Sequence, residues 1–135
     1  MTLADILAAH SGKEGPLLPI LHDVQGAFGH VSEDHIRDIA KSLNLTRAEV
    51  HGVVSFYHDF RSEADTRPVI KLCRAEACQA RGVGLLVADM EPQERVKIEP
   101  VYCLGLCSVG PAALVGGAVY ARLDGPKFAA LVAEQ

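Results

Sequence analysis

The stretch CRAEACQARGVGLLVADMEPQERVKIEPVYCLGLC, residues 73–107, contains all four cysteines of the 135-residue chain. Cys73 and Cys78 form a C-x4-C pair, Cys103 and Cys107 form a C-x3-C pair, and 24 residues separate the two pairs. The four thiols form two pairs and the chain has no other cysteine, which indicates a set of metal ligands rather than scattered core residues. The candidate site is therefore formed by Cys73, Cys78, Cys103 and Cys107.

The segments around the cysteines alternate between strand and helix patterns. Short apolar runs and strict alternation predict strands, and Gly116-Gly117 predicts the turn of a hairpin. The expected elements are a buried strand over residues 69–73, a crossover helix over 80–90, a half-buried strand over 95–99, hairpin strands over 112–115 and 118–121, and a helix from Gly125. This β-α-β-β-β-α order matches a thioredoxin-like layout.

The expected order brings the two cysteine pairs together. Cys73 ends the first strand, and Cys103 closely follows the second. A spacer of 24 residues is long enough for a crossover helix and a return strand, which makes the two strands parallel. Because parallel neighbours end at the same edge of a sheet, we expect the four thiols to converge there.

The first half of the chain predicts a small bundle of short helices. Apolar residues recur at helical spacing from Leu17 to Phe28 and from Ile36 to Leu43. Ser32 predicts a helix N-terminus, and Thr46 with Glu49 forms a capping box ahead of another helix.

The charge changes between the halves. Residues 1–66 have a net charge of −5 and residues 67–135 a net charge of +1, which supports a boundary near residues 61–68. We therefore expect an α+β fold, with a helical bundle over residues 1–66 and a thioredoxin-like domain over residues 67–135.

Composition excludes several classes of protein. A net charge of −4 argues against binding to nucleic acid. Residues 100–120 carry no charge, but Pro111 and four glycines in that segment argue against membrane insertion. The first residues lack the pattern of a secretory signal, so the expected location is a bacterial cytoplasm, where reducing conditions disfavour disulfides.

Several kinds of site can use four cysteines. A 2Fe–2S cluster needs two thiolates for each iron, and Gly105 and Gly110 indicate a tight loop beside the second pair. Structural zinc remains an alternative, although zinc sites favour C-x2-C spacing. Unligated core cysteines also remain open.

Other redox sites do not fit the spacing. A plant-type ferredoxin would need three cysteines in a C-x4-C-x2-C pattern. A Rieske centre would need two histidine ligands, but all six histidines lie at or before His58. Thioredoxin-type chemistry would need a C-x-x-C motif, which the sequence lacks.

At these residues the chain resembles the thioredoxin-like 2Fe–2S ferredoxin subunits of NADH-linked complexes (the complex I 24-kDa type). The resemblance lies in LLPILHDVQGAFGHVSEDHIRDIAKSLNLTRAEVHGVVSFYHDF, in the two cysteine pairs, and in the following Gly110-Pro111. Family members usually have a longer spacer between the pairs, and the shortening is expected near residues 90–100, MEPQERVKIEP. Three segments most resemble the gamma subunit of molybdenum-containing, NAD-dependent formate dehydrogenases: AEVHGVVSFYHDF, LCRAEACQ and EPVYCLGLC.

The resemblance implies one 2Fe–2S cluster, held by the four cysteines, in a one-electron carrier with no substrate-transforming or catalytic residues of its own. The implied partners are an FMN- and NAD-binding flavoprotein subunit, on which the helical bundle would dock, and a larger molybdenum and iron–sulfur catalytic subunit. The alternatives are the equivalent subunit of a bidirectional NAD-linked hydrogenase or of complex I. An alternative of a different class is a zinc-stapled interaction module without a redox role.

Three other features carry expectations. Phe56, Tyr57 and Phe60 are expected to pack the bundle against the second module, with a partner-docking patch as the alternative. Arg74 and Arg81 flank the first cysteine pair and would stabilise a reduced cluster or dock an acidic partner, unless they form a solvated pair with Glu76. Gly110-Pro111 lies where the thioredoxin layout often has a cis-proline.

Overall fold

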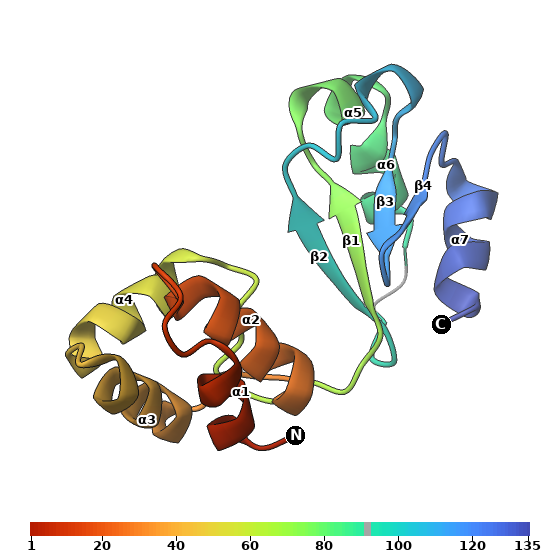
Figure 1. The fold of residues 1–135 in the computed structure, drawn as a ribbon. Helices are drawn as coiled ribbons and strands as arrows, with labels where there is room; N and C mark the ends of the chain where they lie inside the picture. Colours follow the sequence, from red (N-terminus) through yellow and green to blue (C-terminus); the bar gives the residue numbers. More distant parts are fainter. Residues whose placement is uncertain (91–92) are drawn as a thin grey trace. The chain divides into compact units, whose positions relative to one another are not determined.

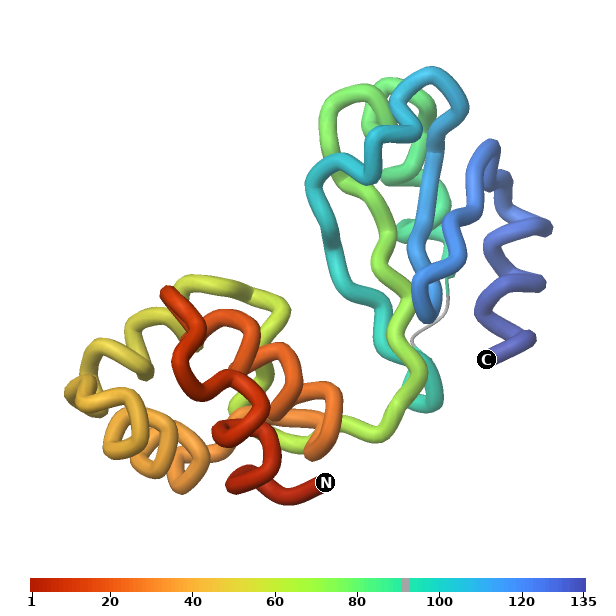
Figure 2. Tube along the Cα trace, in the orientation of Figure 1, coloured from red at the N-terminus to blue at the C-terminus, as the bar shows by residue number. Residues whose placement is uncertain are grey.

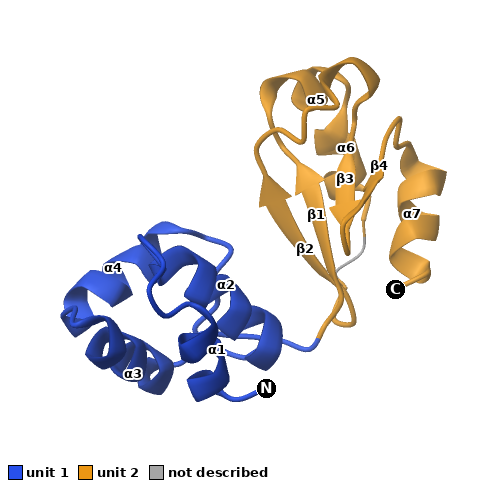
Figure 3. Ribbon diagram, viewed as in Figure 1, with its two compact units in different colours: residues 1–66 blue, residues 67–135 orange. Residues whose placement is uncertain are grey.

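A computed structural model describes residues 1–90 and 93–135, which form two compact units (Figure 3). The first unit is Met1–Thr66 and the second is Arg67–Gln135. Glu91 and Pro92, which belong to the segment where the shortened spacer is expected, lie outside the described residues. No helix in the described part of the chain has the length and apolar character needed to cross a bilayer.

The first unit is a bundle of four helices, as Figure 1 shows. Their inward faces form one apolar core, which includes Leu21, Ile39 and Val50, all fully buried. The expected helices are confirmed, but the sequence patterns did not predict the first one. The helices are α1 (Leu3–Ala9), α2 (Leu17–Phe28), α3 (Glu33–Leu43) and α4 (Arg47–Phe56).

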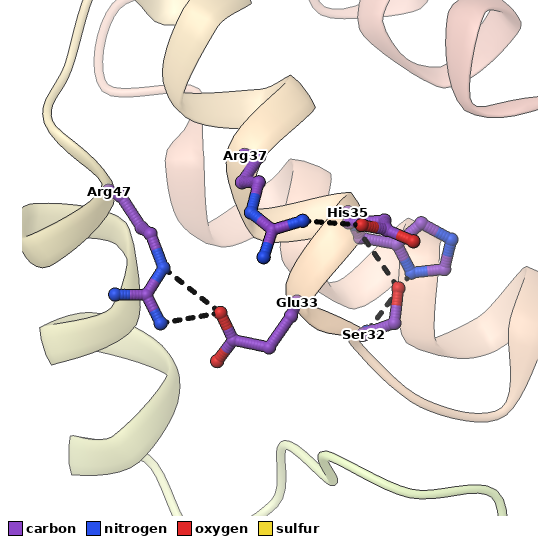
Figure 4. Close-up of polar contacts among 6 residues, drawn as sticks. Ser32, Glu33, His35, Arg37 and Arg47 are labelled. Carbon is purple, nitrogen blue, oxygen red and sulfur yellow. Dashed lines mark hydrogen bonds and ion pairs between the residues drawn. The ribbon is translucent and has the colours of Figure 1, made fainter.

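Side-chain caps fix where α3 and α4 begin. The expected capping box of Thr46 and Glu49 is present at α4. At α3 the Ser32 hydroxyl accepts a hydrogen bond from the His35 backbone N–H, and the His35 Nδ1 accepts one from the Ser32 N–H, both at 3.2 Å (Figure 4). The imidazole of His35 thus occupies a position more often filled by Glu or Gln.

An ion pair connects the starts of the same two helices. Figure 4 shows Arg47 of α4 reaching Glu33 of α3, with Nε at 3.0 Å and Nη2 at 2.6 Å from one carboxylate oxygen. This hydrogen bonding lowers the pKa of Glu33. Both side chains are about half exposed, so the pair contributes little to the stability of the fold.

The second unit is built on a four-stranded sheet with the order β2-β1-β3-β4. β1 is parallel to β2 and antiparallel to β3, which pairs with β4 in the expected hairpin. The unit contains β1 (Val69–Cys73), α5 (Glu76–Ala80), α6 (Val83–Ala88), β2 (Lys97–Val101), the 3-10 turn η1 (Cys107–Val109), β3 (Ala113–Val115), β4 (Ala118–Tyr120) and α7 (Gly125–Ala133). The α+β, thioredoxin-like fold is confirmed.

Two boundaries differ from the expectation. The single crossover helix over 80–90 is wrong, because the connection consists of two short helices. The first, α5, begins earlier, at Glu76, and ends at Ala80, and Gly82, with a left-handed φ of 89°, separates it from α6. A residue in this conformation ends one helix before the next begins. The second strand starts at Lys97 rather than residue 95 and runs on to Val101, so its pairing with β1 extends as far as Cys73.

The His35 cap predicts a pH-dependent stability. Burial, and then His30, lower the pKa of His35, while Asp34 and Asp38 act in the opposite direction. An unfolded histidine binds its proton near pH 6.5. Below that pH the unfolded chain therefore holds more protons at this position, so the free energy of unfolding falls as the pH decreases toward the lower, folded pKa.

Urea unfolding followed by far-UV circular dichroism is expected to give a lower midpoint at pH 5.5 than at pH 7.5. Gln can take the same capping position without titrating, so His35→Gln is the matched control and should reduce this difference. An equal pH dependence in H35Q and the natural chain would contradict the role of His35.

Candidate metal centre

Both cysteine loops leave the sheet at one edge. β1 and β2 are parallel, and Cys73, the last residue of β1, stands opposite Val101, the last residue of β2. Cys103 follows Val101 by two residues, and Figures 1 and 2 show α5 and the loop that leads into η1 at the same end of the sheet. This is the convergence that a parallel pair of strands imposes.

The first pair is buried and held by regular structure. The Cys73 N–H donates to the Ala112 carbonyl at 2.9 Å, so the end of β1 is fixed from both sides. Cys78 lies in α5, five residues further along the chain, and both side chains are almost completely buried. Four residues are enough to leave the strand and turn into the helix, which explains the C-x4-C spacing.

The second pair lies on an exposed loop with a tight turn. Cys103 and Gly105 both have left-handed backbone angles, with φ of 85° and 75°. Such a φ is uncommon for a residue with a Cβ, and it turns the chain so that the Gly105 N–H reaches the Cys103 sulfur at 3.4 Å. The sulfurs of Cys103 and Cys107 are 3.6 Å apart.

Hydrogen bonds connect the second loop to the first pair. Burial raises the pKa of the Cys73 thiol, but hydrogen bonds from the backbone of Ala75, Cys103 and Leu104, together with one from Cys78, outweigh burial and lower the pKa. Two of these backbone donors belong to the second cysteine loop. The Cys73 thiolate is therefore stabilised by the loop that carries the other pair.

The thiols of Cys78 and Cys107 have raised pKa values. Burial, followed by the hydrogen bond with Cys73, raises the pKa of Cys78, while the backbone of Ala112 lowers it. The hydrogen bond and charge of Cys103 raise the pKa of Cys107. Negative charge placed on one thiol thus disfavours charge on the next, and a bound cation would relieve this repulsion.

A cavity of about 340 Å³ lies between the loops. Three of the four cysteines line it, and the sulfur of the fourth, Cys103, lies 3.6 Å from the sulfur of Cys107. Its wall is otherwise mostly aliphatic, which limits the access of water to the sulfurs. The residues that line the cavity are Cys73, Ala75, Glu76, Ala77, Cys78, Leu104, Leu106, Cys107 and Ala112.

Gly110 closes the site on the side of Cys78. A Cβ at this position would lie 2.9 Å from the Cys78 sulfur and 3.4 Å from Cδ of Arg81. The backbone of Gly110 therefore approaches the sulfur more closely than any residue with a side chain could. The peptide bond from Gly110 to Pro111 is cis, as the thioredoxin layout suggested.

The sulfurs are arranged as two pairs. Cys73 is hydrogen-bonded to Cys78, and Cys103 lies against Cys107, while all four are free thiols. Within residues 1–90 and 93–135, no group of three or more Cys, His, Asp or Glu side chains is placed to hold one metal ion. Two pairs of thiols match the demand of a 2Fe–2S cluster for two thiolates on each iron.

The structure thus places the four predicted residues at one edge, and the six histidines in the other unit. Sequence reasoning treated Gly110 as part of a tight loop and missed its contact with Cys78. It also missed Ala75 and Leu104 as backbone donors, because hydrogen bonds from main-chain N–H groups leave no pattern in the residue types.

Comparison with known proteins places the chain among proteins of one family. A family model described as thioredoxin-like [2Fe-2S] ferredoxin matches residues 3–135, nearly the whole chain. The match includes both the helical unit and the unit with the four cysteines.

Individual relatives are subunits of larger enzymes. The chain is 29% identical to the NADP-reducing hydrogenase subunit HndA of Solidesulfovibrio fructosivorans, over 90% of this chain and 78% of the relative. It is 30% identical to an NADH-quinone oxidoreductase subunit from Aquifex aeolicus, over 80% of this chain and 74% of the relative.

A solved structure has a similar fold. The crystal structure of an NAD+-reducing [NiFe]-hydrogenase in the H2-reduced state matches 88% of this chain with a TM-score of 0.69 and 25% sequence identity. This chain spans only 22% of the length of the matching hydrogenase chain.

The close approach at Gly110 predicts that Gly110→Ala disturbs the site. The added methyl group must displace the Cys78 sulfur or the loop, and overpacking of this kind typically costs about 1–3 kcal/mol. We expect G110A to purify with less iron per chain and a lower melting temperature than the natural protein.

Gly84→Ala is the matched control, since it adds the same methyl group in the same unit. Its Cβ would meet only the Gln79 side chain, at 3.7 Å, which is an ordinary contact, and Gly84 lies within α6. G84A is expected to retain its iron. Natural iron content in G110A would contradict the assigned role of Gly110.

Proposed function

Because the chain belongs to the thioredoxin-like [2Fe-2S] ferredoxin family, whose members carry one 2Fe–2S cluster, we propose that Cys73, Cys78, Cys103 and Cys107 hold this cluster. The observation that carries the proposal is the meeting of two cysteine pairs at one sheet edge, with backbone donors of the second loop on the Cys73 sulfur. The chain is an electron-carrier subunit of an NAD-linked oxidoreductase.

The cluster supplies a site that accepts and releases one electron at a time. The protein provides four thiolates as ligands and backbone N–H groups that stabilise their negative charge. Leu104, Leu106 and Ala112 keep part of the site apolar, and Gly110 permits the backbone to approach Cys78. Since Cys103 and Cys107 are exposed, this is the side from which an electron can reach a partner.

No residue of this chain is proposed to transform a substrate. Substrate chemistry belongs to the partner subunits: a flavoprotein that binds FMN and NAD, and a larger catalytic subunit with molybdenum and iron–sulfur centres. The relatives support the general form of this assembly, because they are subunits of NAD- or NADP-linked hydrogenases and NADH-quinone oxidoreductases. The proposed location of the complex is the bacterial cytoplasm.

The helical unit is proposed to dock on the flavoprotein subunit. Phe56 and Tyr57, at the end of α4, are exposed and stack edge to face with ring centres 5.1 Å apart. Exposed aromatic side chains of this kind often anchor protein interfaces. Phe60 differs from them, since it is buried in the core of the helical unit. The expectation that all three aromatic residues share one role is therefore wrong.

Within the family, we propose that this chain is the gamma-type subunit of an NAD-dependent formate dehydrogenase. The proposal is based on the sequences of three segments, AEVHGVVSFYHDF, LCRAEACQ and EPVYCLGLC. The bidirectional hydrogenase and complex I are the alternatives, and a hydrogenase subunit and an NADH-quinone oxidoreductase subunit are among the relatives of this chain. A zinc-stapled module without redox function is disfavoured by the family match.

Identifying the physiological electron donor tests whether the complex is a formate dehydrogenase or a hydrogenase. The natural complex, purified through a tag on this chain, is expected to reduce NAD+ with formate and not with H2. After mixing with formate, rapid freezing should trap an electron paramagnetic resonance signal from a reduced 2Fe–2S cluster. A complex that reduces NAD+ only with H2 would overturn the formate assignment in favour of a hydrogenase.

The matched control is the same complex with Cys103→Ser in this chain. It should lose the signal assigned to this subunit, while the signals from the clusters of the other subunits remain. A complete set of signals in C103S would contradict the assignment of Cys103 as a ligand.

A further inference from the structure

The side chain of Arg81 lies beside the sulfur of Cys78. Cys78 is within α5 and Arg81 caps its C-terminal end three residues later, so the two side chains lie on the same face of the helix. The point where a Gly110 Cβ would stand is 2.9 Å from the Cys78 sulfur and 3.4 Å from Cδ of Arg81. Cδ is the carbon that carries the guanidinium group, so the positive charge of Arg81 is attached next to the sulfur.

Gly110 keeps the sulfur and the arginine together. It is buried, and a Cβ at this position would meet both the Cys78 sulfur and Cδ of Arg81. The backbone of Arg81 is also held in place, because its N–H donates to the Ala77 carbonyl at 3.1 Å. The base of the arginine side chain therefore has a defined position between α5 and the loop that follows Cys107.

The charge of Arg81 is not neutralised within the chain. Among the residues that the structure describes, neither Arg81 nor Arg74 forms an ion pair, so the expected solvated pair with Glu76 is absent there. Arg74 differs in that its Nε is buried without a hydrogen-bond partner in that part of the chain. Of the two arginines, Arg81 is the one whose side chain the structure places beside a cysteine sulfur.

Negative charge on Cys78 is unfavourable without a neighbouring cation. Burial, followed by the hydrogen bond with Cys73, raises the pKa of this thiol. As a cluster ligand Cys78 would carry a thiolate charge, and one-electron reduction adds one more negative charge without forming or breaking a bond to the protein. A positive charge nearby stabilises the reduced form more than the oxidised form, because the reduced form has the larger negative charge.

We propose that Arg81 is the electrostatic partner of the Cys78 sulfur and raises the reduction potential of the cluster. This inference rests on the proposed function, because it requires the four cysteines to hold the cluster. It assigns to one arginine a role that the sequence leaves shared between Arg74 and Arg81. Since Arg81 is exposed, dissolved ions screen its charge, and its effect on the potential depends on salt concentration.

The test is an anaerobic redox titration of the purified full chain, with dithionite as the one-electron reductant, mediator dyes, and electron paramagnetic resonance as the readout. Arg81→Gln removes the charge but keeps a Cδ atom beside Gly110. R81Q is expected to have a more negative midpoint potential than the natural chain in about 0.01 M salt, where the screening length is about 30 Å. The difference should shrink in about 1 M salt, where that length is about 3 Å. Arg81→Lys, which keeps the charge, should stay close to the natural potential.

Arg95→Gln is the matched control. Arg95 is an exposed arginine of the same unit, and it precedes β2 at the end of the sheet opposite to Cys73 and Val101. R95Q loses the same charge and is expected to give a smaller shift than R81Q. A natural potential in R81Q at low salt, which an arginine that only stabilised the end of α5 would give, would overturn the proposal. An equal shift in R95Q would overturn it as well.

A second variant covers the case in which R81Q does not retain its cluster. In Arg81→His the introduced imidazole is charged at about pH 5.5 and neutral at about pH 8. The potential of R81H should therefore fall between these pH values by more than that of the natural chain, and an equal pH dependence would contradict the role of Arg81. A natural chain without iron or visible absorption would instead refute the proposed function, so the two failures are distinguishable.

Discussion

The hydrogen bonds from the backbone of Cys103 and Leu104 to the Cys73 sulfur hold the candidate site together. They connect two loops that are 24 residues apart in sequence, and they form only because β1 and β2 are parallel and in register up to Cys73 and Val101. The left-handed turn at Cys103 and Gly105 then directs the N–H groups of the loop toward the sulfurs. Sheet topology, loop conformation and ligand placement are thus parts of one arrangement.

The arrangement explains why the two pairs differ in environment. Cys73 and Cys78 are buried within the sheet and helix framework, whereas Cys103 and Cys107 lie on an exposed loop. A one-electron carrier needs both properties, because a rigid, apolar side limits solvent rearrangement and an exposed side lets a partner approach. We propose different roles for the two units: residues 67–135 transfer electrons and residues 1–66 dock on the partner.

Much of this could be predicted from sequence, because it depends on residue type and spacing. The cysteine pairs indicated the candidate site, Gly116-Gly117 predicted the hairpin, and Thr46 with Glu49 predicted the start of α4. The break at Gly82 was less clear, since glycine is tolerated within helices as well as between them. The contact of Gly110 with Cys78 and the burial of Arg74 Nε depend on tertiary packing, which local patterns do not encode.

The metal and sulfide content of the purified chain tests the central claim most directly. Two irons and two acid-labile sulfides per chain are predicted, with one unpaired electron spin per chain after one-electron reduction. One zinc per chain, with neither iron nor sulfide and no visible absorption, would contradict the account.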